Sequence, residues 1–482
     1  MTNIKSYKLF IDGKWINAQS GETFDIINPA NEQCVAKAAN GDERDTLKAI
    51  DASWNAFKSW SSLPVSDRAD IMMKIYNLML ANKEELAQTI SLEMGKPIVQ
   101  ARNEVQNAAS YVQWNAEEAK RVYGNTIPAW VPNKRLKTIL QPIGPVAAIT
   151  PWNFPLSMVT RKISPALAAG CTVVFKPAEQ TPGSAVQFFE IAEQAGMPKG
   201  VINLITGNPS KIGNTLLSDK RIRKVTFTGS TKVGKLLLRQ AADHVKKVSM
   251  ELGGHAPFIV FDDADLEKAA SSVVANKFFN AGQVCVCANR IYVQKSIQDE
   301  LVMIVKQKTE ALKIGNGLQE EVQLGPLVSS EALAKVKRQV DDSLSRGANL
   351  ITGGSEYETI GKEKGYFYLP TILTEVNERM TIAQEETFGP VMPIFTFETE
   401  EEVIEKANNT DYGLAAYLFT ENLSRSIRVS EALEYGMVGI NDAAIAAVQA
   451  PFGGVKESGM GREGGPESLI DFLETKFIST VI

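Results

Sequence analysis

Apolar residues recur every three or four positions through much of the first quarter of the chain. This spacing places them on one face of a helix and predicts four amphipathic helices. The predicted helices are Asp45–Phe57, Ser66–Ala81, Lys83–Met94 and Pro97–Arg121. Before them, Tyr7–Asn28 predicts two short strands around the turn Asp12-Gly13-Lys14. We therefore expect a group of helices that packs beside another element.

From Pro145 the pattern changes to short apolar runs that alternate with amphipathic helices. The predicted strands are Val146–Thr150, Cys171–Lys176, Val201–Thr206, Lys224–Thr228 and Lys247–Leu252. This alternation is typical of a doubly wound parallel α/β sheet, which binds nucleotides at the carboxyl ends of its strands. A second α/β run extends from Pro257–Phe261 to the predicted strand Gly436–Asn441, so we expect a second α/β domain.

Two segments interrupt this alternation. Tyr123–Trp130 and Leu136–Gln141 predict a hairpin, and Lys476–Ile482 predicts a strand with no hairpin mate nearby. A two-stranded hairpin is marginal in water and needs a partner for its edge. We expect both segments to serve subunit contacts, with packing inside the same chain as the alternative.

Composition narrows the classes of function. The 482 residues, 44% of them hydrophobic, are too many for a single core. The formal net charge of −5 and the absence of a basic block argue against nucleic acid as a partner. No apolar run is long enough to span a membrane, and Met1–Trp15 lacks the apolar core of a signal peptide. We therefore expect a cytoplasmic protein without a membrane segment.

Cysteine and histidine usage limits the chemistry further. The four cysteines are too few and too scattered for a disulfide framework, which fits a reducing cytosol. The two histidines, His244 and His255, leave little material for a Ser-His-Asp triad or a His-based metal site, so we predict no metal. If catalysis needs a base, a carboxylate is the strongest candidate.

Two thiols lie one residue apart in the stretch Lys277–Arg290, directly after Ala-Gly-Gln. A Gly at a helix end lets the chain reverse and can leave backbone N–H groups free. An exposed, electrostatically favoured thiolate at Cys285 would be a nucleophile, with its own N–H directed at the oxygen that it creates. The alternative is a small buried hydrophobe, the usual role of a free cysteine.

Five stretches, taken together, point to a family. They are the cysteine stretch, Thr150–Pro155, Phe227–Thr231, Met250–Gly254 and Glu385–Pro390. In this order and at these separations they closely resemble the NAD(P)-dependent aldehyde dehydrogenase superfamily over nearly the whole chain. The resemblance implies an NAD-binding domain of residues 1–120 and 142–252 and a catalytic domain of residues 253–465. Residues 121–141 and 466–482 would form a small β oligomerisation element of a homo-oligomer, a dimer or a dimer of dimers.

The resemblance also implies catalytic roles. Cys285 would add to an aldehyde, and the adduct would expel hydride to a nicotinamide and leave a thioester. The Asn153 side chain and the Cys285 N–H would hold the oxyanion, and Glu251 would activate the hydrolytic water. Alone, Asn153 would more simply be read as a loop cap and Glu251 as a surface residue, but the joint pattern favours catalysis.

For the cofactor, Gly229-Ser230 ends a strand and begins a helix, where free N–H groups suit a pyrophosphate oxygen. The family holds the adenosine ribose at the positions of Lys176 and Glu179. A carboxylate there accepts bonds from both ribose hydroxyls but repels a 2′-phosphate. Glu179 therefore favours NAD, while Lys176 leaves NADP open. The other cofactor positions implied by the resemblance are Trp152, Leu252, Glu386 and Phe388.

The substrate rests on fewer residues. The stretches Cys285–Cys287, Asn153–Lys162 and Pro451–Gly459 resemble the succinate-semialdehyde dehydrogenase subfamily. In that subfamily the positions of Arg161 and Ser458 bind the far carboxylate of a four-carbon semialdehyde, which suits the planar fork of Arg.

One position departs from that subfamily, which usually carries a second Arg where this chain has Phe279. Phe279 resembles members that oxidise less polar aldehydes, and Phe154 is a further substrate-binding candidate. We expect a small aldehyde, with succinate semialdehyde favoured and a broad aliphatic aldehyde dehydrogenase as the alternative. A catalytically idle scaffold is disfavoured because Cys285, Glu251 and Asn153 are all present.

Two further motifs have open interpretations. Subfamily members can couple the position of Cys287 to the nucleophile as an oxidative switch, but a small packing residue is the favoured reading. Gly459–Gly464 matches Gly-x-Gly-x-x-Gly but follows no predicted strand, so we interpret it as a flexible loop.

Overall fold

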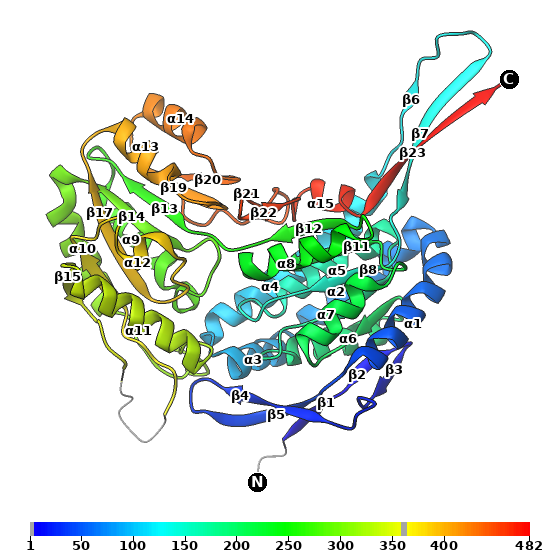
Figure 1. Ribbon diagram of the computed structural model, residues 1–482, viewed down its shortest axis with the longest axis horizontal. Helices are drawn as coiled ribbons and strands as arrows, with labels where there is room; N and C mark the ends of the chain where they lie inside the picture. The colour runs from blue at the N-terminus through cyan, green and yellow to red at the C-terminus, as the bar shows by residue number, and fades with distance from the viewer. Residues whose placement is uncertain (1–3, 358–363) are drawn as a thin grey trace.

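Two sheets covered by helices form the body of the molecule (Figure 1). The computed structural model describes residues 4–357 and 364–482, so Met1–Asn3 of the predicted NAD-binding domain lie outside it. The first sheet has eight strands in the order β22-β12-β11-β8-β9-β10-β2-β3, and its five central strands are parallel. Its strands are β2 (Leu9–Ile11), β3 (Lys14–Ile16), β8 (Val146–Ile149), β9 (Val173–Lys176), β10 (Ile202–Leu204), β11 (Lys224–Thr228), β12 (Lys247–Glu251) and β22 (Gly459–Met460). The predicted doubly wound parallel sheet is confirmed.

The helices around this sheet follow the apolar periodicity. Asp42 and Asp45 form a capping box at the start of α1, and left-handed Gly95 ends α3. The four helices predicted for this part of the chain are present with end points shifted by a few residues. The helices are α1 (Glu43–Ser62), α2 (Val65–Ala81), α3 (Lys83–Met94), α4 (Ile98–Glu118), α5 (Ser157–Ala169), α6 (Gly183–Gln194), α7 (Pro209–Ser218) and α8 (Thr231–Ala242).

The second sheet has seven strands in the order β15-β16-β17-β14-β13-β19-β20, and all but β15 are parallel. Its strands are β13 (Ala256–Val260), β14 (Ala288–Gln294), β15 (Asn349–Thr352), β16 (Thr371–Thr374), β17 (Val391–Phe397), β19 (Ala415–Phe419) and β20 (Met437–Ile440). Its helices are α9 (Leu266–Phe278), α10 (Gln298–Glu310), α11 (Ser330–Ser345), α12 (Thr381–Gln384), α13 (Glu400–Asn408) and α14 (Leu423–Ala432). The sequence did not predict α14, β16 or β17.

Three strands project from the body as a narrow sheet, at the upper right of Figure 1. These are β6 (Thr126–Ile127), β7 (Lys134–Pro142) and β23 (Leu473–Val481). The predicted first strand of the hairpin is much shorter than expected. The C-terminal strand has no hairpin mate next to it in the sequence. It pairs instead with the distant β7, antiparallel from Leu473↔Pro142 to Val481↔Lys134, so the alternative of packing inside the same chain is observed.

Smaller elements complete the fold, and one of them corrects a prediction. They are β1 (Lys5–Tyr7), β4 (Thr23–Asn28), β5 (Gln33–Ala39), β18 (Tyr412–Gly413), β21 (Val455–Lys456) and α15 (Glu467–Ile470), with short 3-10 turns at 119–121, 279–282 and 295–297. The glycine-rich segment at 459–464 is not simply a loop, because β22 pairs antiparallel with β12. None of the helices described is both long and apolar enough to cross a bilayer.

Candidate active site

The segment between α9 and β14 carries Cys285 and has an unusual backbone. Asn280 and Ala281 have φ values of 51° and 55°, and Gly282 follows at 74°. A left-handed conformation costs a non-glycine residue about 1–2 kcal/mol. At Gly282 a Cβ would also lie 2.2 Å from the Gly389 carbonyl oxygen. The predicted reversal at this glycine is therefore present and extends over three residues.

Hydrogen bonds hold this strained turn in place. The Asn280 N–H donates to Gln100 Oε1 at 2.9 Å, and the Asn280 side chain donates to the Asn153 carbonyl at 3.2 Å. Gln283 Nε2 donates to the Asn280 carbonyl at 3.1 Å, and Gln283 Oε1 accepts from the Val328 N–H at 2.9 Å. The turn is thus held by groups from both halves of the molecule.

Cys285 lies where two cavities meet. One, of about 280 Å³, is lined by Trp152, Asn153, Gly229 and Phe388 among others. The other, of about 790 Å³, is lined by residues that include Tyr111, Phe154, Arg161, Phe279 and Phe452. Cys285 and Met158 line both. We refer to them as the cofactor-side cavity and the substrate-side cavity. A larger groove of about 990 Å³ lies elsewhere, at the base of β23, and contains none of the predicted site residues.

The state of the Cys285 thiol differs from the prediction of a favoured thiolate. The residue is partly exposed, but desolvation raises its pKa to about 12. Arg161 lowers the pKa, while the carboxylates of Glu386 and Glu251 raise it further. Burial therefore disfavours the thiolate form of Cys285.

Asn153 lies beside the nucleophile with a free N–H. Its Nδ2 donates to the Gln283 carbonyl at 3.0 Å, which uses one of the two amide hydrogens. The residue is 3% exposed and lines the cofactor-side cavity. The second amide hydrogen of Asn153 has no acceptor among the described residues.

Glu251, at the end of β12, is buried and lines neither cavity. It is 3% exposed, and neither carboxylate oxygen has a hydrogen-bond partner among the described residues. A Cβ on Gly453 would lie 2.8 Å from Oε1, so the carboxylate points toward the 453 loop. Desolvation and Glu463 raise its pKa well above the usual value. The protonated form therefore persists to higher pH than in an exposed glutamate.

Arg161, Lys162 and Glu463 form a buried charge cluster next to Glu251. Arg161 Nε lies 3.0 Å and Lys162 Nζ 2.7 Å from the Glu463 carboxylate. Although burial opposes it, the two cations hold the pKa of Glu463 below its usual value. Of the three residues of the cluster, Arg161 also lines the substrate-side cavity.

The predicted substrate residues divide into two groups. Arg161, Phe154 and Phe279 line the substrate-side cavity, where the two phenylalanine rings stack at 6.1 Å between centroids. Ser458 does not line it. Its hydroxyl is fully buried, donates to the Gly253 carbonyl at 2.7 Å and accepts from the Gly413 N–H at 2.9 Å. Ser458 therefore fixes backbone, and the expectation that it binds a carboxylate is not met by this geometry.

The cofactor-side cavity gathers most of the predicted cofactor residues. Its lining includes Trp152, Gly229, Ser230, Leu252, Glu386 and Phe388. Glu386 accepts from the Gly254 N–H at 2.9 Å, and desolvation raises its pKa to about 7. A Cβ on Gly254 would lie 2.2 Å from the Cys285 carbonyl oxygen, so only glycine fits there.

Lys176 and Glu179 lie outside this cavity, at the carboxyl end of β9. They form an ion pair, and Lys176 Nζ also donates to the Pro177 carbonyl at 3.1 Å. The Thr150 N–H donates to the Lys176 carbonyl at 3.1 Å, which ties this edge to the loop that carries Trp152. The pair therefore sits on the same strand edge as the cavity.

The donor set at this edge fits a dinucleotide. Ser230 caps α8 through the Val233 N–H at 3.4 Å, so the other first-turn amides of α8 lie free beside the cavity. Thr228 Oγ1 lines the cavity and has no partner among the described residues. No group of three or more His, Cys, Asp or Glu residues with metal-binding geometry occurs in residues 4–357 and 364–482.

The Cys287 thiol is buried, whereas Cys285 is partly exposed. Cys287 is 1% exposed, and its sulfur lies 3.6 Å from the Lys277 carbonyl oxygen and 3.8 Å from that of Asn276. The thiol faces the end of α9, which fits the packing interpretation. Coupling to Cys285 stays a prediction.

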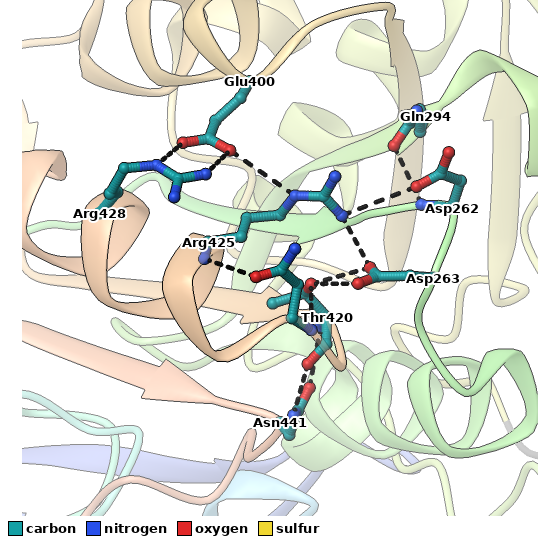
Figure 2. Close-up of polar contacts among 9 residues, drawn as sticks. Asp262, Asp263, Gln294, Glu400, Thr420, Arg425, Arg428 and Asn441 are labelled. Atoms are coloured by element: carbon teal, nitrogen blue, oxygen red, sulfur yellow. Dashed lines mark hydrogen bonds and ion pairs between the residues drawn. The ribbon is translucent and has the colours of Figure 1, made fainter.

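One wall of the substrate-side cavity was missed from the sequence. It is formed by residues 441–446, which follow β20. Asn441 is left-handed and exchanges two hydrogen bonds with the backbone of Thr420, of 3.0 and 2.8 Å. Figure 2 shows Arg425 between Asp262, Asp263 and Glu400, with Thr420 linking Asp263 to Asn441. No local motif marks this wall, because its anchors lie after β13, after β19, on α13 and on α14.

Comparison with known proteins agrees with this geometry. Residues 15–478 match the model of the aldehyde dehydrogenase family. The chain belongs to the aldehyde dehydrogenase family. The predicted family and enzyme class, an NAD(P)-dependent oxidoreductase that acts on aldehydes, are confirmed.

Similar members of the family act on different aldehydes. The chain is 50% identical to a 3-sulfolactaldehyde dehydrogenase of Pseudomonas putida over 97% of this chain and 96% of that protein. It is 48% identical to the NADP+ succinate-semialdehyde dehydrogenase of Escherichia coli, over 99% and 98%. A crystal structure of an NADP-dependent enzyme of E. coli matches with a TM-score of 0.97 at 48% identity, covering 100% of this chain and 99% of that one.

Proposed function

We propose that this aldehyde dehydrogenase oxidises a small aldehyde with an anionic group at its far end, and that succinate semialdehyde is the favoured substrate. The observation that carries the proposal is Arg161. It is 7% exposed, lines the cavity that ends at Cys285, and has an Nη2 without a partner among the described residues. A guanidinium in that position pairs with a carboxylate or a sulfonate through its fork.

In the proposed reaction, the Cys285 thiol gives its proton to solvent water, and the sulfur then bonds to the aldehyde carbon. The carbonyl oxygen becomes an oxyanion and accepts hydrogen bonds from Asn153 Nδ2 and the Cys285 N–H. The nicotinamide cofactor, when bound, supplies the hydride acceptor, so the carbon is oxidised and Cys285 is left as a thioester. Loss of one such oxyanion donor costs about 3–4 kcal/mol of barrier in other enzymes.

Hydrolysis of the thioester returns the enzyme to its starting state. Glu251 takes a proton from water, the hydroxyl bonds to the thioester carbon, and the C–S bond breaks to release the acid and the Cys285 thiol. Since Glu251 lines neither cavity, this step includes rotation of its side chain toward Cys285. Its oxygens are free to move because no hydrogen bond to the described residues holds them.

The cofactor preference that we propose is NAD over NADP. Glu179, held by Lys176 at the end of β9, would face the adenosine ribose and repel a 2′-phosphate. We also propose that the protein is a homo-oligomer, because the β6–β7–β23 sheet projects with exposed apolar residues that include Trp130 and Phe477, 72% and 56% exposed.

A broad aliphatic aldehyde dehydrogenase is the second candidate function. The stacked Phe154 and Phe279 favour it, because they give the cavity an apolar surface at the position where the subfamily usually carries a second Arg.

The deciding experiment compares kcat/KM for succinate semialdehyde, butyraldehyde and glutarate semialdehyde. We expect at least a tenfold preference for succinate semialdehyde, equal to about 1.4 kcal/mol, and its loss in Arg161→Ala. Butyraldehyde serves as the matched control, since its turnover by Arg161→Ala should change little. Equal or better use of butyraldehyde by the wild type would assign the pocket to uncharged aldehydes instead.

A further inference from the structure

A second buried ion pair lies next to the active site and has no part in the chemistry described so far. Lys96 and Glu104, on either side of the first turns of α4, contact each other with side chains that are 0% and 1% exposed. Burying two charges is costly, and an apolar pair of similar volume is often as stable or more stable. Since stability alone does not explain this ion pair, its role is inferred from the groups that it contacts.

Both partners hold the loop that carries Asn153. Lys96 Nζ donates to the Asn153 carbonyl at 2.8 Å and lies 3.9 Å from the centre of the Phe154 ring. Glu104 Oε1 accepts from the N–H groups of Leu156 and Ser157, at 2.9 and 3.2 Å. These amides begin α5, which carries Arg161 one turn later. The pair thus fixes five consecutive residues from the oxyanion donor to the start of the substrate helix.

A third residue, Gln100 on α4, contacts the turn that carries Cys285. Gln100 and Glu104 lie four residues apart on α4, a spacing that brings them to one helical face, and Lys96 lies in the segment just before the helix. Gln100 Oε1 accepts from the Asn280 N–H at 2.9 Å, at the first left-handed residue before Cys285. Its Nε2 donates to the Gln323 carbonyl at 3.1 Å. One helix face therefore contacts both the Asn153 loop and the cysteine turn.

We propose that Lys96, Gln100 and Glu104 form a positioning strip that sets the distance between the Asn153 amide and the Cys285 sulfur. The proposal rests on the proposed role of Asn153 at the oxyanion. Charged groups suit this task because a backbone carbonyl and two amides need directed partners, which an apolar pair does not provide. A displacement of about 1 Å in such a geometry can cost on the order of 100-fold in rate.

The test removes the charges while keeping the volume. The double variant Lys96→Met/Glu104→Met leaves no unpaired buried charge, so its thermal unfolding midpoint should stay near that of the wild type. We expect kcat to fall at least about tenfold with little change in KM, since the lost alignment acts on the transition state. Arg102→Gln is the matched control on the same helix, because Arg102 pairs with exposed Glu84 and Glu320, and it should keep full activity.

A cycle with Asn153→Ala separates positioning from general damage. If the strip acts through Asn153, adding Asn153→Ala to the double variant lowers kcat far less than it does in the wild type. The proposal of a positioning strip is overturned if Asn153→Ala lowers kcat by the same factor in the double variant as in the wild type. It is also overturned if the double variant is stable and keeps the wild-type kcat. An Asn153→Ala single variant with full kcat overturns the proposed oxyanion role instead.

Two milder variants serve if the double variant fails to fold. Lys96→Arg retains the charge and a donor and should restore most of the kcat lost in Lys96→Met. Gln100→Leu removes only the bonds to Asn280 and Gln323, and it should lower kcat severalfold at unchanged KM. Full activity in Gln100→Leu together with no rescue by Lys96→Arg contradicts the proposal.

Discussion

The two cavities that meet at Cys285 are built in different ways. The cofactor-side cavity is formed at strand ends and helix starts, where backbone groups and glycines such as Gly229 and Gly253 determine the shape. The substrate-side cavity is formed by side chains, with the Phe154–Phe279 stack, buried Arg161 and the wall at 441–446. If the roles proposed above hold, the first cavity can serve any aldehyde that the family oxidises, whereas the second decides which aldehyde is oxidised.

The largest effect should come from the atom that both cavities share. Cys285→Ala should lower aldehyde oxidation by at least about 10⁴-fold, because the bond-forming sulfur is gone. Binding of NAD, measured by calorimetry, should persist because the remaining lining of the cofactor-side cavity is intact. Turnover comparable to that of the wild type would exclude Cys285 as the nucleophile.

A smaller but still large effect should arise from Glu251, which lies behind both cavities. Glu251→Gln should slow the steady state by about 10²–10⁴-fold. Rapid mixing should still show a burst of up to one NADH per active site, because only thioester hydrolysis is blocked. A slow rate without a burst would place Glu251 in an earlier step instead.

The same residue predicts the pH dependence of the wild type. Desolvation and Glu463 raise the pKa of Glu251, and only its carboxylate form accepts a proton. The rate of hydrolysis should therefore rise with pH through a pKa above the usual glutamate value of about 4.3. This rise with pH should be absent from the residual rate of the Glu251→Gln variant. A pH profile that is the same in both proteins would contradict the assignment.

On the cofactor side, Glu179→Ser should narrow the discrimination between NAD and NADP. Removing a carboxylate that faces a 2′-phosphate should improve kcat/KM for NADP relative to NAD by about tenfold, or 1.4 kcal/mol. The KM for the aldehyde is the internal control, because Glu179 lies at the far end of the cofactor-binding edge from Cys285. An unchanged ratio would show that Glu179 does not contact this part of the cofactor.

On the substrate side, Phe279→Arg should sharpen selectivity for an anionic aldehyde. A second guanidinium would face the same cavity as Arg161, and a gain of about 1 kcal/mol, roughly fivefold, is expected in the ratio of kcat/KM for succinate semialdehyde to that for butyraldehyde. Phe279→Leu is the control that removes the aromatic stack without adding charge. If Phe279→Leu raised the same ratio of kcat/KM equally, the change would be due to the extra room in the cavity and not to the added charge.

The smallest effect should come from Cys287, whose sulfur faces α9 rather than either cavity. Cys287→Ala should retain nearly full activity. Peroxide should inactivate the variant and the wild type equally, and a thiol reductant should restore both equally. If the activity lost to peroxide were recovered with a thiol reductant only when Cys287 is present, the result would instead support the oxidative switch.

The contrast between a cavity built at strand ends and one built from side chains also explains which features could be predicted from the sequence. The strands of the parallel sheet and the helices before residue 122 follow from apolar periodicity, and most of the predicted cofactor residues come together because their motifs sit at strand ends. The 441–446 wall could not be predicted, since its anchors are scattered over four segments of the chain. The raised pKa of Cys285 depends on desolvation by distant segments, and the backbone bonds of Ser458 depend on Gly253 and Gly413.

Glu463 has a consequence for how the enzyme is made. The carboxylate that pairs with both Arg161 and Lys162 comes from the last twenty residues of the sequence, and β23 completes the sheet begun by β7. During translation, the first-made half of the active site therefore contains two buried cations without their counter-charge. Chains that stop before Glu463 should therefore lack these ion pairs and be inactive.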